Sequence, residues 1–259
     1  MVNGALGRRL MSLALLAVFG VVALALGLAT PLAFALVAVA LIGAALLPHI
    51  TGAAAVFGHG GLILFCLALG AHLIPGFHNL LVLDHVQAGP ESTAFTMYLN
   101  LDKPMVMFAV LLARPGMING TAPIRGAALL VAVVTLPVLF ILAMSAGAVR
   151  PEVSLPPWWM IFAISNLFLT CLTEEAFFRG YLQSFIASKR GPAIGIAVAG
   201  TLFGLAHFGG GLALVIFASI LGAACGLGYY ATGRLWVPVL MHFGFNALHL
   251  FLFTYPTSA

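Results

Sequence analysis

The chain has 259 residues, of which 63% are hydrophobic and only 6% are charged, and its formal net charge is +4. A soluble globular domain carries about a quarter charged residues, so this composition excludes a water-facing surface over most of the chain. It predicts an all-α polytopic membrane protein whose main solvent is the lipid bilayer. The ten Lys and Arg residues form no basic tract, which argues against nucleic acid as a partner. The three cysteines lie in apolar runs and predict no disulfide framework and no metal cluster.

Eight stretches of the chain approach the roughly 20 apolar residues that a membrane-spanning helix needs. They are residues 10–29, 32–48, 60–76, 126–148, 157–187, 192–207, 211–231 and 235–254. A shorter stretch at 104–113 is compatible with a tilted span, a re-entrant segment or an interfacial helix. The prediction is therefore a bundle of eight or nine transmembrane helices around an intramembrane active site.

The first apolar stretch follows Arg8 and Arg9, as in a signal peptide, but it is too long for a typical signal sequence and predicts a retained span. Segment 77–103 is the most polar part of the chain and predicts an extramembrane loop. If the N-terminus is cytoplasmic and 104–113 crosses the membrane, seven basic loop residues lie inside and two outside. The seven are Arg8, Arg9, Arg114, Arg125, Lys189, Arg190 and Arg234, and the two are Lys103 and Arg150. This asymmetry favours nine crossings and a cytoplasmic N-terminus, in a bacterial inner membrane.

Ionisable residues inside an apolar helix are costly and usually functional. Glu174, Glu175 and Arg179 lie in such a helix. Glu175 and Arg179 are one turn apart on one face and can form an ion pair. Glu174 is rotated by about 100° from Glu175, which leaves its carboxylate free to hold a water molecule as a general base. A salt bridge that only stabilises the helix would explain Glu175 and Arg179 but not the second carboxylate.

His207 lies where a predicted helix meets the glycine run 209–211. Alone, it is equally compatible with a packing role and a catalytic role. His242 and Asn246 are four residues apart on one helix face, where two convergent donors could form an oxyanion hole or hydrogen bonds between helices. His249 lies near the same face. Glu174, His207 and Asn246 are each about 18 to 22 Å from one end of their helices, which predicts a common depth in the membrane.

The order of these motifs on late transmembrane helices resembles the CPBP family, the group of type II CAAX prenyl proteases and bacteriocin-processing (Abi) proteins. The resemblance covers roughly residues 157–254. The motifs are EExxxR at Glu174, Glu175 and Arg179, FxxxH at Phe203 and His207, and HxxxN at His242 and Asn246. The resemblance implies a glutamate-dependent intramembrane endopeptidase. It further implies that Glu174 and His207 activate water, that His242 and Asn246 stabilise the oxyanion, and that Glu175 and Arg179 support Glu174.

These observations divide the chain into residues 1–150, whose role is unassigned, and a CPBP-like catalytic core at 151–259. We expect a membrane-anchored protein or peptide as substrate and no cofactor, with zinc bound by glutamate and histidine as the alternative. A non-enzymatic immunity or binding protein of the same fold is a second hypothesis. A proton-coupled transporter is a third, but no internal repeat supports it. Small residues at four-residue spacing predict close helix packing; they are Gly200, Gly204, Ala218, Gly222 and Gly226.

Overall fold

The computed structural model describes residues 16–18, 20–118, 120 and 123–258. Arg8, Arg9 and much of the predicted span at 10–29 lie outside the described residues. Five described helices are long and apolar enough to cross a membrane, and four shorter apolar helices accompany them. Each of the nine predicted apolar stretches contains or overlaps one of these helices. The prediction of an all-α polytopic membrane protein is confirmed.

The part of the chain before residue 150 contains the helices α2 to α5. They are α2 (Pro31–Leu46), extended by the short turn η1 (Leu47–His49), α3 (Gly52–Gly70), α4 (Lys103–Ala113), followed by η2 (Pro115–Ile118), and α5 (Gly126–Ser145). Helix α3 begins earlier and ends earlier than the predicted span at 60–76, so those predicted bounds were wrong. The glycines at 58, 60 and 61 do not interrupt it, since backbone groups in lipid must keep their helical hydrogen bonds.

One long helix dominates the C-terminal half. It runs from Trp159 to Arg190 and consists of α6 (Trp159–Ser165), η3 (Asn166–Cys171), α7 (Leu172–Glu175), η4 (Ala176–Gln183) and α8 (Ser184–Arg190). The segments η3 and η4 are π-helical, a wider winding that is common at functional sites. After it come α9 (Pro192–Leu205), the turn η5 (Phe208–Gly210), α10 (Gly211–Thr232) and α11 (Trp236–Leu252).

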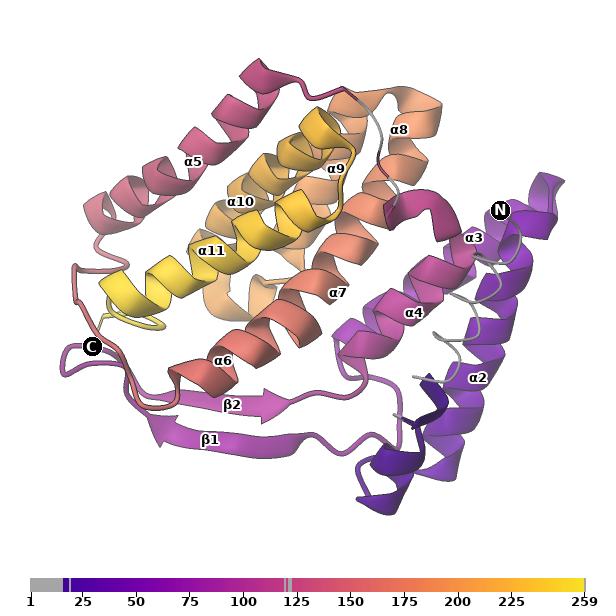
Figure 1. The fold of residues 1–259 in the computed structure, drawn as a ribbon, viewed down its shortest axis with the longest axis horizontal. Coiled ribbons are helices and arrows are strands. Elements are labelled where there is room, and N and C mark those ends of the chain that lie inside the picture. Colours follow the sequence, from indigo (N-terminus) through magenta and orange to yellow (C-terminus); the bar gives the residue numbers. More distant parts are fainter. Residues whose placement is uncertain (1–15, 19, 119, 121–122, 259) are drawn as a thin grey trace.

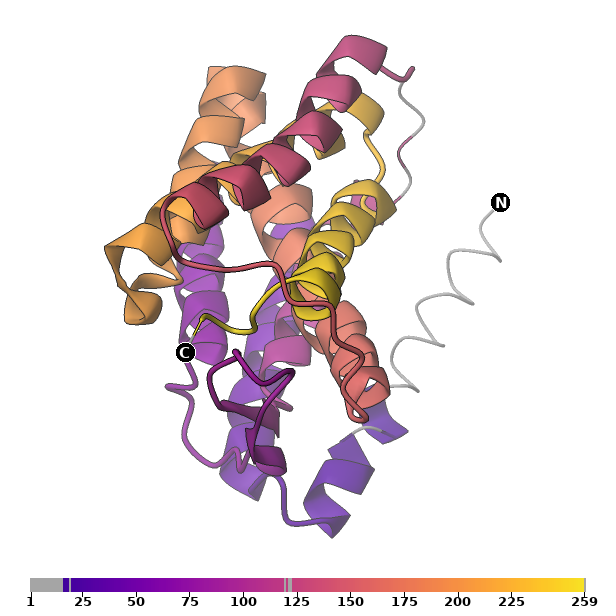
Figure 2. The ribbon, with the colours of Figure 1, turned by 90° about the vertical axis from the view of Figure 1, so that its left-hand side faces the viewer.

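The polar segment 77–103 is a β-hairpin and not only a loop. Strand β1 (Leu80–Val86) pairs antiparallel with β2 (Phe95–Leu99), and the register shifts twice along the pair. The hairpin caps one end of the bundle (Figures 1 and 2). It is tied there to the C-terminal tail, because the amide of Thr93 donates to the carbonyl of Thr257 at 3.1 Å.

The long helix occupies the middle of the bundle. Helix α4 packs on one side of it, backed by α2 and α3, while α9 and α11 pack on the other, backed by α10 and α5 (Figure 1). Helices α9 and α10 pack so closely at Gly204 that a Cβ atom on this residue would lie 2.4 Å from the carbonyl oxygen of Val215. The predicted close packing at this glycine is therefore present.

Helix α4 lies inside the bundle. Its 11 residues extend about 16 Å, about half of the hydrocarbon thickness, and six of its side chains are buried. It starts beside the hairpin. The chain that follows reaches the opposite end, where the amide of Arg125 donates to the carbonyl of Ala231 near the end of α10 at 2.8 Å. Segment 104–113 is therefore a short internal helix that carries the chain between the two ends.

Candidate active site

Glu175 lies at the centre of a buried charged cluster. Its side chain and that of Arg179 have no exposed surface, and Arg179 Nε lies 3.0 Å from Glu175 Oε2. The other carboxylate oxygen, Oε1, accepts a hydrogen bond from His242 Nδ1 at 2.9 Å. The predicted pairing of Glu175 with Arg179 is present, and His242 completes it from α11. The long helix and α11 are thus joined through a single carboxylate.

Arg179 extends this cluster to two more helices. Its Nη2 donates to the carbonyl oxygen of Gly222 in α10 at 3.1 Å, and its guanidinium lies 4.5 Å from the centre of the Phe203 ring in α9. One turn later, Gln183 Nε2 donates to the carbonyl of Gly226 at 2.9 Å. A Cβ atom on Gly226 would lie 2.6 Å from Gln183 Oε1. These small residues therefore do more than pack helices, because they expose backbone carbonyls to buried side chains.

Glu174 has different surroundings from Glu175. Its side chain is 19% exposed, and its Oε1 lies 3.9 Å from Lys103 Nζ at the start of α4. Its Oε2 is buried without a hydrogen-bond partner in the protein. Buried carboxylate oxygens are rarely left without a partner, and a water molecule is a common one. The two glutamates therefore have separate partners, as predicted, but Glu174 is not fully free, because one of its oxygens faces Lys103 and only the other is available.

His207 follows the end of α9 and is half-buried. Its Nδ1 lies 2.8 Å from the carbonyl oxygen of Phe203. Because a carbonyl only accepts, Nδ1 carries the proton, and Nε2 of the neutral ring has the free lone pair. The centre of the Phe203 ring lies 4.8 Å from that of His207 and 5.4 Å from that of His242. Phe203 thus contacts both histidines, whereas no hydrogen bond joins His207 to Glu174 among the described residues.

Asn246 contacts a residue that the sequence did not single out. Its Nδ2 donates to Asn166 Oδ1 at 3.1 Å and lies 3.7 Å from Cys171 Sγ. Its amide donor thus points to η3, where Cys171 is also a neighbour of His242. His249 donates from Nε2 to the carbonyl of Thr254 at 3.2 Å, a contact that holds the C-terminal tail. Asn166 is a polar residue two turns before Glu174, and this spacing was the signal that could have identified it.

Residues 156–248 match the family model described as Rce1-like, type II CAAX prenyl endopeptidase Rce1-like. The resemblance carried by the three motifs is confirmed. No curated protein and no solved structure matches the chain significantly. The Rce1-like match and the apolar helices together support a protease embedded in a membrane. All six predicted site residues lie within the Rce1-like segment, whereas Lys103 lies outside it.

The side chains of the Rce1-like segment do not fit a zinc ion. Within the part of the chain that the structure describes, no three residues among His, Cys, Asp and Glu converge to form a metal site. Both oxygens of Glu175 already face Arg179 and His242. A metal site that used Glu175 would need to break these pairs, and we derive no catalytic step through a metal.

Proposed function

We propose that this chain is a glutamate-dependent intramembrane endopeptidase that cleaves membrane-anchored proteins or peptides. The observation that carries the proposal is the unequal environment of the two neighbouring glutamates. Glu175 is committed to Arg179 and His242, whereas Glu174 keeps a buried oxygen without a partner. A carboxylate kept apart from the ion-pair cluster suits the activation of water.

The proposed reaction begins at Glu174. Its carboxylate accepts a proton from a water molecule, while the free Nε2 of His207 accepts a second hydrogen bond from the same water and orients it. The water oxygen then attacks the carbonyl carbon of the peptide bond, and the electron pair of the C=O bond moves to the oxygen. The carboxyl group of Glu174 returns its proton to the amide nitrogen as the C–N bond breaks.

In this mechanism His242 and Asn246 stabilise the oxyanion. The Nδ1–H group of His242 donates to Glu175, so the donor for the oxyanion is Nε2 of the protonated ring. Arg179 holds the carboxylate of Glu175, the partner of this ring, in place. Asn246 can reach the oxyanion only if its amide releases Asn166 or Cys171. We therefore assign the main share of oxyanion stabilisation to His242.

We propose that catalysis needs no metal, because the oxygens of Glu175 are already paired. The measurement is cleavage by the purified protein in the presence of a chelator, together with metal analysis. We expect full activity and no stoichiometric metal. Loss of activity in the chelator, restored by zinc, would establish the zinc-dependent alternative.

The decisive test replaces Glu174 in cells. Membrane proteins from cells with the wild-type chain, with Glu174→Gln and without the gene are compared by mass spectrometry of their termini. We expect the same unprocessed proteins to accumulate with Glu174→Gln and without the gene. The matched control is Glu91→Gln, at an exposed carboxylate in the turn of the hairpin. Wild-type processing by Glu174→Gln would reject the water-activating role of Glu174, and normal processing in cells without the gene would favour a non-enzymatic binding protein.

A further inference from the structure

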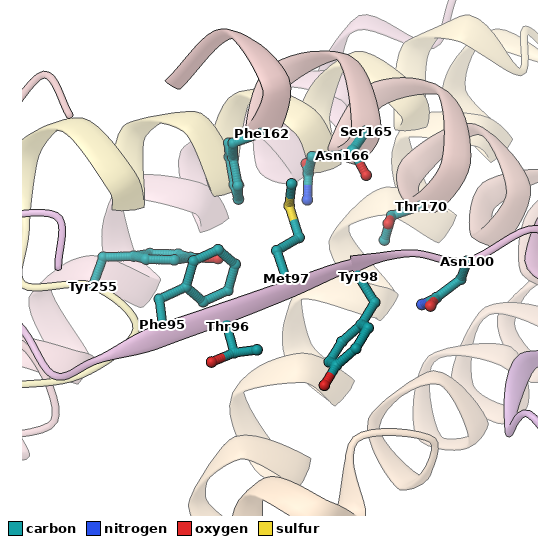
Figure 3. Close-up of a pocket in the computed structure, with 10 residues that line it drawn as sticks. All are labelled: Phe95, Thr96, Met97, Tyr98, Asn100, Phe162, Ser165, Asn166, Thr170 and Tyr255. Atoms are coloured by element: carbon teal, nitrogen blue, oxygen red, sulfur yellow. The ribbon is translucent and has the colours of Figure 1, made fainter. Parts of the chain in front are cut away.

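A cavity of about 260 Å³ lies between strand β2 and the first part of the long helix (Figure 3). Ten residues line it: Phe95, Thr96, Met97, Tyr98, Asn100, Phe162, Ser165, Asn166, Thr170 and Tyr255. Half of them come from β2 and the residue just after it, and most of the others come from α6 and η3. The mechanism proposed above uses none of these ten side chains directly.

The cavity borders the edge of strand β2. Four consecutive residues, 95–98, line it, although neighbouring side chains of a strand point to opposite faces. Figure 3 shows this alternation, since Phe95 and Met97 point toward the helix and Tyr98 points away. A cavity that contacts residues on both faces of the strand must also contact the edge of the strand, where its backbone groups lie. Among the described residues, β2 pairs only with β1, and no other backbone hydrogen bond reaches residues 95–99.

The cavity adjoins the proposed site. Thr170 precedes Glu174 by one helical turn, and Asn166, two turns before Glu174, is bonded to Asn246. On the other side, Asn100 is only three residues before Lys103, whose ammonium group lies 3.9 Å from Glu174. The helix wall and the strand wall of the cavity therefore both continue along the chain to residues at the carboxylate of Glu174.

The lining has the chemistry that an extended polypeptide needs. The cavity offers hydroxyl and amide groups from Ser165, Asn166, Thr170 and Asn100 in a chain that is otherwise apolar. Asn100 Oδ1 is buried without a hydrogen-bond partner, which leaves an acceptor available for a peptide N–H group. Unpaired strand edges bind extended peptides through backbone hydrogen bonds, and neighbouring pockets then take alternate side chains.

We propose that the free edge of β2 binds an extended segment of the substrate as an added strand and directs the adjoining peptide bond to Glu174. The inference rests on the proposed protease function and goes beyond it, because it assigns substrate binding to the N-terminal half of the chain. The hairpin is then the element that holds the substrate unwound, a state in which its peptide bonds are accessible to water.

The first test uses a cross-strand pair of residues as variant and control. Met97 and Leu83 face each other in the hairpin register, and only Met97 lines the cavity. Met97→Trp should fill the cavity and cause the same unprocessed proteins to accumulate as Glu174→Gln, at wild-type abundance in the membrane. Leu83→Trp should process them normally. Normal processing by Met97→Trp, with Glu174→Gln inactive, would overturn the strand-binding proposal and leave the protease standing. No accumulation with Glu174→Gln would overturn both.

A second test needs no change in the protein. Synthetic peptides that span the segment processed in a Glu174-dependent manner carry a single N-methyl group at successive positions and are cleaved by the purified wild-type chain. Each methyl group removes one backbone donor. We expect KM to rise roughly five- to tenfold at every second residue on one side of the cleaved bond, with kcat little changed. A rise without this alternation, or no rise, would overturn strand addition.

Discussion

The ammonium group of Lys103 lies 3.9 Å from Oε1 of Glu174, and the two side chains are 24% and 19% exposed. Lys103 begins α4, in the half of the chain for which the motifs suggested no role. Asp102, which is buried, accepts hydrogen bonds from the amide of Lys103 and from His72 Nδ1 at 2.9 and 2.6 Å. The carboxylate of Asp102 therefore fixes the start of α4, and the charge of Lys103 faces the carboxylate that we assign to water activation.

Lys103→Met should lower kcat roughly three- to tenfold with little change in KM, because a partly exposed ion pair orients a side chain but contributes only modest energy. Lys103→Arg should retain most of the activity, since it keeps the charge. The measurement is the initial rate of peptide cleavage by the purified protein. Lys189→Met, at the exposed end of α8, is the control. Equal rates for Lys103→Met and the wild type would show that this contact does not act on Glu174.

Glu175→Gln should destabilise the protein by about 3–5 kcal/mol, because it leaves the guanidinium of Arg179 buried without its counter-charge. The double variant Glu175→Gln with Arg179→Met should recover part of this loss, since the unpaired charge is removed as well. Thermal unfolding in detergent micelles measures both. A wild-type midpoint for Glu175→Gln would contradict the stabilising role of the cluster.

His207→Ala should reduce kcat by about 10²- to 10⁴-fold, the range typical of a lost general base or orienting group. Folding should change little, because His207 is only half-buried after the end of α9. His249→Ala is the comparison. It removes a contact to the C-terminal tail and should lower stability more than it lowers kcat. Similar kinetic losses in both variants would argue against a specific role for His207.

Gly204→Ala should destabilise the helix bundle by about 1–3 kcal/mol. The added Cβ atom would lie 2.4 Å from the carbonyl oxygen of Val215, so α9 and α10 would have to separate. Gly244→Ala in α11 has no atom within 4 Å of the added Cβ and should leave the stability unchanged or slightly raised. The check is the thermal midpoint of each variant, and equal midpoints would place the close α9–α10 contact in doubt.

The orientation in the membrane can be tested at the two ends of the bundle. The basic residues at the helix ends opposite the hairpin predict, by the positive-inside rule, that this end is cytoplasmic. They are Arg114, Arg125, Lys189, Arg190 and Arg234. In intact cells an impermeant thiol reagent should label Glu91→Cys in the hairpin turn, but label Arg190→Cys only after lysis. The reverse labelling pattern would invert the proposed orientation.

Much of the architecture follows from local properties of the sequence. Apolar length predicts a transmembrane helix because the bilayer leaves no other partner for backbone polar groups. The bounds of α10 and α11 therefore lie close to those expected. The start of α3 was missed, because glycines that would interrupt a helix in water are tolerated in lipid. The hairpin was missed because its strands, at 80–86 and 95–99, are short and do not alternate regularly between apolar and polar residues.

The sequence by itself determined which polar residues are exceptional and which of them share a helix face, since both follow from composition and helical periodicity. Only the tertiary structure decided which of them meet. It pairs His242 with Glu175, directs Asn246 to Asn166 and brings Lys103 to Glu174. These contacts join residues that are 67 to 80 positions apart. They depend on how helices pack against each other, which helical periodicity along a single segment does not encode.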